Sequence, residues 1–144
     1  MDFQTTNEFD EVIPKFNDVG YLPPGVHLST LDEIASRFGS ESELRRAQMD
    51  SVRWLVEMAK KAGILRMILN GSFVTDVFEP NDVDCALLLS PDFPVDQVAA
   101  AELNGGLPFV DLHMVEPNEF AILVDNFYAT DRDSTPKGVI EVIL

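Results

Sequence analysis

The segment Val83–Leu89 constrains the fold more than any other part of the chain, because all of its residues except Asp84 are apolar. A short and nearly continuous apolar run is typical of a strand that is buried on both faces of a sheet. Three further strands are predicted, over residues 64–69, 109–115 and 138–144. We therefore expect a small β-sheet with the strand 83–89 near its centre.

Segments with helical spacing separate these strands. Four helices are predicted, over residues 31–38, 41–62, 95–103 and 118–128. Capping boxes are expected at Thr30 with Glu33 and at Ser40 with Glu43, and Gly63 suits the C-terminal end of the second helix. This order of elements predicts the α+β fold class, with a small mixed β-sheet and helices mainly on one side.

The chain is expected to divide into an arm and one domain. Its 144 residues are enough for a single domain with its own core. The first part of the chain mixes apolar and acidic side chains without helical spacing, and the Pro-Pro-Gly sequence within Tyr21–His27 predicts a rigid turn. We therefore expect an extended N-terminal arm over residues 1–28 and a single domain over residues 29–144.

The charge balance limits the classes of partner. The chain has 25 Asp and Glu against 10 Lys and Arg, which gives a net charge of −15. Such a surface repels phosphate backbones, so we expect no extensive nucleic-acid binding. Carboxylates but no Lys or Arg lie between Met67 and Asp131. These carboxylates are either a solvated acidic face or ligands gathered around a divalent cation, and composition alone does not distinguish the two.

Two observations concern the compartment. No apolar run is long enough to span a membrane, and the N-terminal residues lack the apolar core of a secretory signal. The single cysteine, Cys85, has no partner for an internal disulfide. We therefore expect a cytoplasmic protein that makes no membrane contact.

Aspartates mark two of the predicted strands. Asp82 and Asp84 lie at the start of the strand 83–89, and their side chains point the same way because side chains alternate along a strand. Asp111 lies inside the next predicted strand, with His113 on the same face. If the two strands are neighbours, three carboxylates converge, and such a group raises a pKa or recruits a cation. Hard oxygen ligands suit Mg²⁺, and two such ions about 3.5–4 Å apart support displacement at phosphorus.

A glycine-serine turn supplies the second half of a candidate site. Gly71 and Ser72 follow the strand 64–69, and nine residues separate Ser72 from Asp82. Glycine allows a phosphate to approach the backbone closely, and a helical turn after it directs N–H groups at the phosphate. The Ser72 hydroxyl can donate to a phosphate oxygen. Together with the aspartates, this turn can hold a metal-bound triphosphate.

These motifs resemble a known signature. Three segments of this chain resemble the signature of the DNA polymerase β-type nucleotidyltransferase superfamily: Leu69-Asn70-Gly71-Ser72, Asp82-Val83-Asp84 and Val110-Asp111-Leu112. An uncharacterised small bacterial family of predicted nucleotidyltransferases is also similar to the turn Pro23-Pro24-Gly25-Val26-His27 and to the ending Lys137-Gly138-Val139-Ile140. The motif covers residues 64–115, and the weaker likeness covers most of the chain.

The resemblance implies a nucleotidyltransferase-like domain and an activity. It implies Mg²⁺, as two ions, bound by Asp82, Asp84 and Asp111, and a nucleoside triphosphate (NTP) bound at Gly71-Ser72. The enzyme would transfer a nucleoside monophosphate to an acceptor hydroxyl and release pyrophosphate, with Asp111 helping to activate the hydroxyl. The acceptor would be a protein side chain, a tRNA end or a small molecule, and the acidic charge favours a protein or a small molecule.

One part of the superfamily pattern is missing. Many small members have an arginine shortly after the Gly-Ser pair, whereas this chain continues Phe73-Val74-Thr75-Asp76. The triphosphate then needs positive charge from the metal ions or from another part of the chain. Lys137 is taken as the nucleotide-binding cation, and the other candidates are Arg45, Arg46, Arg53, Arg66 and Arg132.

Two interpretations without catalysis also fit the sequence. A nucleotidyltransferase-like fold can serve as an antitoxin or regulatory binding module of a bacterial conflict (toxin–antitoxin) system, which agrees with the small size, the acidity and the missing arginine. An acidic decoy that mimics nucleic acid is a weaker alternative, because it leaves the spacing of the Gly-Ser and Asp-x-Asp motifs unexplained.

Overall fold

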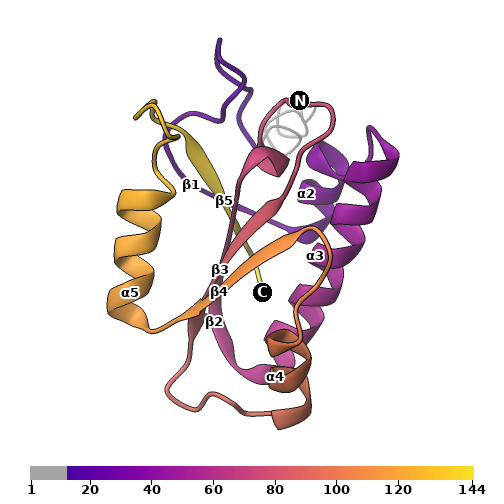
Figure 1. The fold of residues 1–144 in the computed structure, drawn as a ribbon, viewed down its shortest axis with the longest axis vertical. Coiled ribbons are helices and arrows are strands. Elements are labelled where there is room, and N and C mark those ends of the chain that lie inside the picture. Colours follow the sequence, from indigo (N-terminus) through magenta and orange to yellow (C-terminus); the bar gives the residue numbers. More distant parts are fainter. Residues whose placement is uncertain (1–12) are drawn as a thin grey trace, which may run out of the picture.

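The computed structural model describes residues 13–144, so the first twelve residues of the predicted arm lie outside the described part. These residues form one mixed sheet of five strands in the order β1-β5-β2-β3-β4 (Figure 1). The strands are β1 (Gly25–Ser29), β2 (Ile64–Asn70), β3 (Val83–Leu89), β4 (Val110–Val115) and β5 (Gly138–Val142). The helices are α2 (Leu31–Phe38), α3 (Glu43–Ala62), α4 (Gln97–Asn104) and α5 (Pro117–Ile122), with the short helical turns η1 (Ser72–Val74) and η2 (Leu123–Phe127). The predicted α+β class is confirmed.

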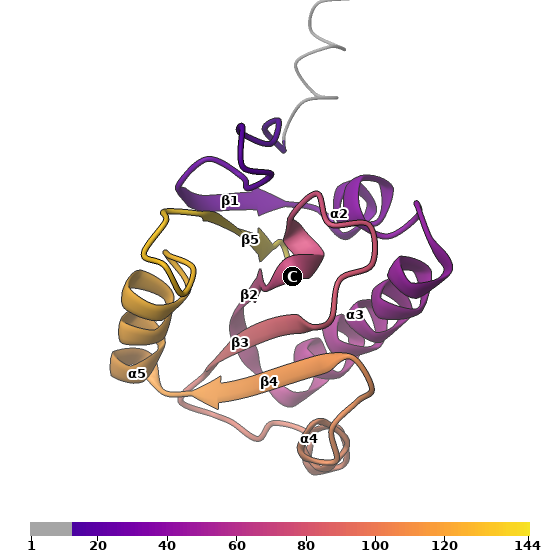
Figure 2. The same ribbon diagram turned by 45° about the horizontal axis from the view of Figure 1, so that its top comes forward.

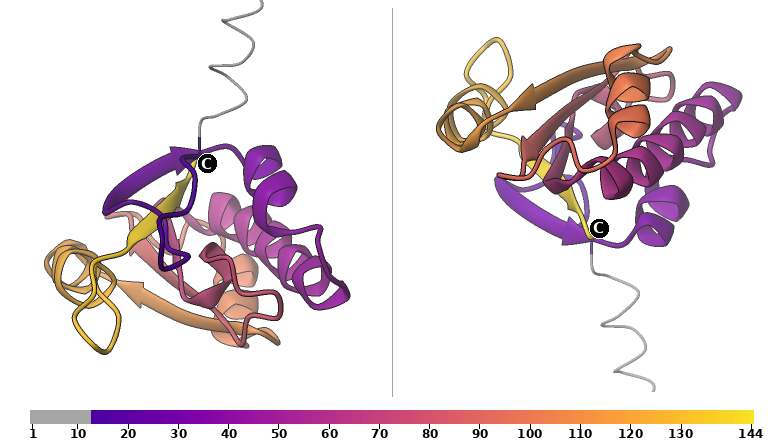
Figure 3. Two further views of the ribbon diagram at one scale, coloured as in Figure 1. Left: turned by 90° about the horizontal axis from the view of Figure 1, so that it is seen from above. Right: turned by 90° about the horizontal axis from the view of Figure 1, so that it is seen from below.

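Helices cover the two faces of the sheet unequally. The helices α2, α3 and α4 lie on one face, and α5 lies on the other (Figure 2 and Figure 3). The α3 face holds the larger apolar core, which includes Ile34, Leu55 and Leu87. The α5 face holds a smaller cluster around Ala86 and Phe120. Helices therefore lie mainly on one side, as predicted, and the α5 face keeps the smaller share of the apolar packing.

Alternation along β3 explains why its sequence is almost wholly apolar. It pairs antiparallel with β2 and parallel with β4, so it is an internal strand of the sheet. Cys85 and Leu87 are fully buried in the larger core, whereas Ala86 and Leu88 pack in the smaller cluster. Asp84 alternates with Ala86 and therefore lies on the α5 face, at the start of the strand.

Strand β1 was not predicted from the sequence, which instead indicated a turn at Tyr21–His27 within an extended arm. The structure begins a strand at Gly25 and pairs it in parallel with β5. His27 Nε2 lies 2.7 Å from the Pro23 carbonyl oxygen, and a side chain at Gly138 would collide with that same carbonyl. Pairing with a strand from the other end of the chain therefore makes this part of the arm an edge strand.

The helix ends follow local sequence rules, with one difference. The predicted capping box of α2 is present. Helix α3 begins later than predicted, because Ser42 rather than Ser40 is its N-cap, with Ser42 Oγ accepting the Arg45 N–H at 3.1 Å. Gly63 ends this helix as predicted, in the left-handed region with a φ of 92°.

Candidate functional site

Three polar residues lie in a row across the α5 face of the sheet. Asn70 at the end of β2 is in register with Asp84 of β3, and Asp84 is in register with Asp111 of β4. Neighbouring strands lie about 4.8 Å apart. The sequence predicts that carboxylates converge if the strands of Asp84 and Asp111 are neighbours. These two strands, β3 and β4, are paired. The row therefore joins a buried amide and two carboxylates where these strands meet.

Gly71 lets the chain turn directly against Asp84. Its φ of 84° lies in the left-handed region, which favours glycine. A Cβ at this position would lie 3.2 Å from Asp84 Oδ2 and 3.0 Å from the Asp82 carbonyl oxygen. The predicted glycine turn and the Asp-x-Asp segment are therefore adjacent, and a side chain at residue 71 would intrude on the Asp84 carboxylate.

Ser72 is tied to the loop that precedes β3. Its Oγ accepts the Asn81 N–H at 3.0 Å, and its carbonyl oxygen accepts the Thr75 hydroxyl at 2.7 Å. The only hydrogen bond of the Ser72 hydroxyl within residues 13–144 is the one it accepts. Its hydroxyl hydrogen is therefore available to an oxygen atom of a ligand.

Two of the candidate cations are used elsewhere. The buried guanidinium of Arg45 donates to four backbone carbonyl groups, among them those of Phe73 at 2.7 Å and Thr75 at 2.8 Å. Arg66 forms a two-pronged ion pair with Glu141, with N–O distances of 2.9 and 2.7 Å. Arg45 therefore holds the backbone of the loop after η1 in place, and Arg66 neutralises the Glu141 carboxylate on β5.

Lys137 brings positive charge to the polar row. Its N–H donates to the Ala129 carbonyl at 2.9 Å, and its Nζ donates to Asn70 Oδ1 at 2.8 Å. Burial lowers the pKa of Lys137, and the carboxylates of Asp84 and Asp131 oppose that lowering. The ammonium group therefore lies at the β2 end of the row, close enough to Asp84 to interact with its charge.

An open hollow of about 590 Å³ joins these groups. Three of the predicted site residues line it, namely Ser72, Asp84 and Lys137. Arg132 adds a second cation from the loop before β5, so two of the candidate cations face the same space. The rest of the lining consists of Asn70, Asn126, Phe127, Tyr128, Thr130 and Asp131.

The other two aspartates lie outside this lining. Asp111 is exposed on β4, and its Oδ2 is 3.6 Å from His113 Nε2. Asp82 is exposed directly before β3. Within residues 13–144, no three His, Cys, Asp or Glu side chains are gathered closely enough to hold a metal ion together. The structure thus pairs Asp84 with Asp111 but does not draw all three predicted carboxylates into one cluster.

The electrostatics of the site centre on Asp84, which is half-buried. Burial raises the pKa of Asp84, and the nearby carboxylates of Asp111 and Asp82 raise it further, whereas Lys137 lowers it. Added positive charge would relieve the repulsion between Asp84 and Asp111. This carboxylate is therefore the group in the row that gains most from a bound cation.

The turn η2, which continues α5, supplies two aromatic residues at its C-terminal end. Helical spacing over 118–128 predicts Phe127 on the apolar face, but Phe127 is 68% exposed and Tyr128 is buried in its place. The reason is that η2 is a π-helical turn, which shifts the side chains that follow it around the helix axis. The buried Tyr128 hydroxyl has no hydrogen-bond partner within the described residues. Burial raises the pKa of Tyr128, so this hydroxyl stays protonated and can donate.

Asp131 holds the loop that carries Arg132. Its Oδ1 accepts the N–H groups of Asp133 and Thr135 at 2.8 and 2.9 Å, and its Oδ2 accepts the Tyr21 hydroxyl at 2.8 Å. These bonds, led by the one from Thr135, lower the pKa of Asp131. No sequence motif identified this anchor, because it joins the predicted arm to a loop near the other end of the chain.

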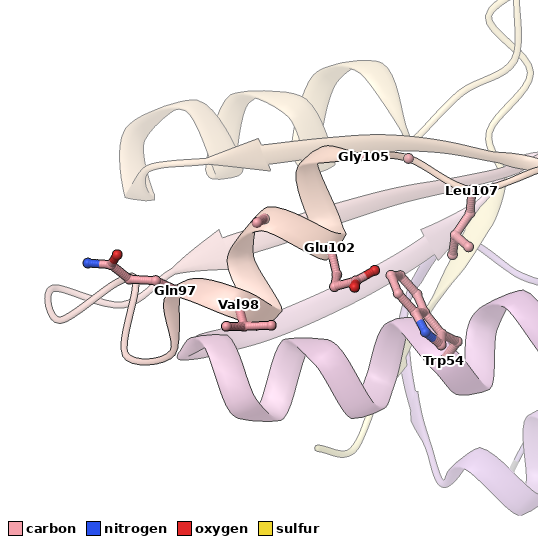
Figure 4. Close-up of a pocket in the computed structure, with 8 residues that line it drawn as sticks. Trp54, Gln97, Val98, Glu102, Gly105 and Leu107 are labelled. Atoms are coloured by element: carbon pink, nitrogen blue, oxygen red, sulfur yellow. The ribbon is translucent and has the colours of Figure 1, made fainter.

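A second and larger hollow, of about 710 Å³, lies on the opposite face between α3 and α4 (Figure 4). Glu102 of α4 points toward the ring of Trp54, and Leu107 lies next to that ring. Glu102 is the one ionisable side chain in its lining. A single carboxylate provides neither an acid–base pair nor a cation for catalysis. The hollow beside Asp84 is therefore the candidate active site.

The donor set suits a magnesium ion. In proteins Mg²⁺ keeps several waters and takes one or two carboxylates together with substrate phosphates. Asp84 and Asp111 supply two carboxylates on adjacent strands, and the hollow beside Asp84 has space for phosphate and water. A cluster of three carboxylates is therefore not a requirement for this ion to fit.

The fold and the site define the class of protein, an α+β domain whose mixed sheet carries a polar hollow on its more open face. Residues 14–143 match a family of unknown function (DUF6932), and the chain belongs to this family. No curated protein and no solved structure matches the chain. Among residues 13–144, no helix combines the length and apolar character needed to cross a bilayer.

Proposed function

We propose that the protein is a Mg²⁺-dependent nucleotidyltransferase, which transfers a nucleoside monophosphate from an NTP to an acceptor hydroxyl and releases pyrophosphate. The observation that carries this proposal is the position of Ser72, Asp84 and Lys137 around one hollow, with Asp111 in register beside Asp84. These groups come from four separate parts of the chain. Each of them has a chemical role in such a transfer.

Binding of the triphosphate is assigned to cations and hydrogen-bond donors. Lys137 and Arg132 both line the hollow, and charge-assisted hydrogen bonds from such groups to phosphate are stronger than neutral ones. The Ser72 hydroxyl hydrogen is available as a further donor. Gly71 has no side chain, so a phosphate beside Asp84 meets no steric barrier from the turn.

Asp84 and Asp111 would hold Mg²⁺, which supplies positive charge that polarises the phosphoryl group. Asp111 is exposed and can therefore accept the proton of the incoming hydroxyl. As that proton moves to Asp111, the oxygen–phosphorus bond to the acceptor forms and the bond to pyrophosphate breaks. His113 lies 3.6 Å from the Asp111 carboxylate and can orient it during this transfer.

The nucleoside part of the substrate also has a candidate contact. Phe127 is exposed where it lines the hollow, at the end of the turn η2. Aromatic side chains stack on the faces of all bases. We assign Phe127 to the base, and this assignment leaves the choice among NTPs open.

The test measures transfer directly. The full chain is incubated with labelled NTPs, Mg²⁺ and a lysate, and labelled products and pyrophosphate are quantified. We expect Mg²⁺-dependent labelling that falls at least about 100-fold in the Asp82→Ala/Asp84→Ala variant, because the cation and the triphosphate lose their support. Asp92→Ala, an exposed carboxylate in the loop after β3, is the matched control and keeps full labelling. Labelling that is absent, or equal in all three proteins, contradicts the proposal.

A second candidate function is a binding module in a toxin–antitoxin system. The edge strand β1 exposes Val26 and Leu28, at 44% and 55%, and an edge strand can pair with a strand of a partner protein. The net charge of −15 favours a basic partner. A stable complex with a basic protein that survives the Asp82→Ala/Asp84→Ala change, without any transfer activity, would favour this candidate.

A further inference from the structure

We infer that the site binds one divalent cation, between Asp84 and Asp111, and that the ammonium group of Lys137 takes the place that a second ion would occupy. This inference rests on the proposed function, because it concerns how the same site balances its charge. It also departs from the pair of Mg²⁺ ions that the sequence resemblance implies.

The first observation is that Lys137 is held in place. Its Nζ donates to Asn70 Oδ1 at 2.8 Å, and Asn70 is only 3% exposed. On the backbone, the Lys137 N–H donates to the Ala129 carbonyl at 2.9 Å and the next N–H, of Gly138, donates to the Leu22 carbonyl at 2.9 Å. Both ends of this lysine are therefore anchored, unlike those of a surface lysine that moves freely in solvent.

The second observation is the order of groups in the row. Asn70, Asp84 and Asp111 lie on three successive strands, and the amide oxygen at the β2 end already accepts a hydrogen bond from the ammonium. The Asn70 oxygen is therefore already used, which leaves Asp111 of β4 as the neighbour in the row that can share a cation with Asp84. A second ion about 3.5–4 Å from the first, on the other side of Asp84, would lie beside the ammonium and be repelled by it.

The third observation concerns the number of ligands. Among residues 13–144, the acidic side chains do not form a group of three that could hold a metal. Two bound ions would have to share the carboxylates of one pair, Asp84 and Asp111. One ion plus one ammonium needs fewer oxygen ligands, and Lys137 Nζ, held on Asn70 Oδ1 at 2.8 Å, already places a positive charge at the β2 end of the row. The charge that a second ion would supply is therefore partly present in the chain itself.

The experiment counts bound ions. Crystals of the full chain are grown with Mn²⁺ and a non-hydrolysable ATP analogue, and manganese is located by anomalous diffraction. We expect one manganese peak, beside Asp84 and Asp111, with the Lys137–Asn70 hydrogen bond intact. Two peaks would overturn this inference and leave the proposed function standing. No manganese and no nucleotide at the site would overturn both.

A solution measurement tests the role of Lys137 itself. Mn²⁺ is titrated by electron paramagnetic resonance in the presence of the same analogue, and the bound ions per chain are counted. We expect one ion for the wild type and two for Lys137→Met, in which the Asn70 oxygen and the space beside it are released. Arg53→Met, which removes an exposed cation of α3 outside the hollow, should keep one ion. A count that stays at one in a folded Lys137→Met protein contradicts the inference.

Discussion

The two faces of the sheet use the same strands in different ways. On the α3 face, Cys85 and Leu87 of β3 are fully buried in the larger core. On the α5 face, the alternate residues of the same strand differ in burial: Asp84 is half-buried, whereas Ala86 and Leu88 are buried in the smaller cluster. Three helices cover the first face, whereas α5 covers only part of the second (Figure 2).

The difference shows that one strand can serve two purposes: its alternate residues pack the core on one face and form the candidate site on the other. A strand that is apolar on one face can carry a carboxylate on the other, because successive side chains point to opposite faces. Substitutions on the α3 face should therefore change stability with little effect on the site. Substitutions around Asp84 should change ligand binding with a smaller effect on stability.

The largest effect on stability is expected from Leu87→Ala on the α3 face. Leu87 is fully buried, and its truncation leaves a cavity that should cost about 3 kcal/mol of unfolding free energy. Urea denaturation measures this loss. NTP transfer per folded molecule should remain at the wild-type level, and a loss of transfer in fully folded protein would break the separation of the two faces.

A smaller loss is expected from Gly71→Ala in the turn at the site. Its φ of 84° is unfavourable for alanine, at a cost of about 2 kcal/mol, and the new Cβ would lie 3.2 Å from Asp84 Oδ2. We expect NTP affinity, measured by calorimetry, to fall at least tenfold. Gly106→Ala is the matched control, since Gly106 has a φ of 79° and nothing within 4 Å of its Cβ position. Equal affinity losses in both variants would show that strain alone, and not the contact with Asp84, is responsible.

Asp84→Asn should stabilise the fold while it abolishes transfer. The folded protein raises the pKa of Asp84, so the ionised carboxylate destabilises the fold at neutral pH. The substitution should therefore raise the free energy of unfolding at pH 7, by an amount that the partial solvent exposure of Asp84 reduces. The gain should shrink as the pH falls through the raised folded pKa, and it should vanish below the unfolded value of about 3.9.

Thermal unfolding of wild type and Asp84→Asn across this pH range tests the sign. Asp92→Asn, at an exposed loop position, serves as the control and should show no such pH-dependent gain. An Asp84→Asn protein that is less stable than wild type at pH 7 would mean that the ionised carboxylate is favourably paired in the fold.

The smallest effect is expected from Tyr128→Phe. The Tyr128 hydroxyl is buried and has no hydrogen-bond partner within residues 13–144, so its removal should change the unfolding free energy by less than about 0.5 kcal/mol. A calorimetric comparison with and without an NTP measures whether a ligand uses this hydroxyl. A stability loss above about 1 kcal/mol without ligand would show that the hydroxyl is already satisfied in the folded protein.

Local patterns were enough to predict most elements of the fold. The strand Val83–Leu89 and the capping box at Thr30 are confirmed, because each depends on residues close together in the chain. Strand β1 was not predictable in this way, since Gly25–Ser29 becomes a strand only through its pairing with β5. Helical spacing groups Phe127 with the apolar residues Phe120 and Val124, but the π-helical turn leaves Phe127 exposed.

The candidate site was predicted in part. Gly71 and Asp84 are adjacent as the motif implied, and Asp111 lies in register beside Asp84. The sequence named Lys137 together with several other candidate cations, but it could not show that Arg132 lines the same hollow or that the buried Arg45 supports the loop after η1. The resemblance to nucleotidyltransferases, the NTP and the magnesium remain predictions that the experiments above test.

The sequence by itself determined two features of the site. Alternation along the strand puts Asp84 and Cys85 on opposite faces of the sheet, and the glycine at position 71 permits the left-handed backbone of the turn. Tertiary structure alone decided that Lys137 meets Asn70 across a separation of 67 residues. The physical reason is the range of each interaction. Side-chain direction and turn geometry follow from neighbouring residues, whereas the charge at a site depends on which distant strands pair, and that is settled only when the whole sheet forms.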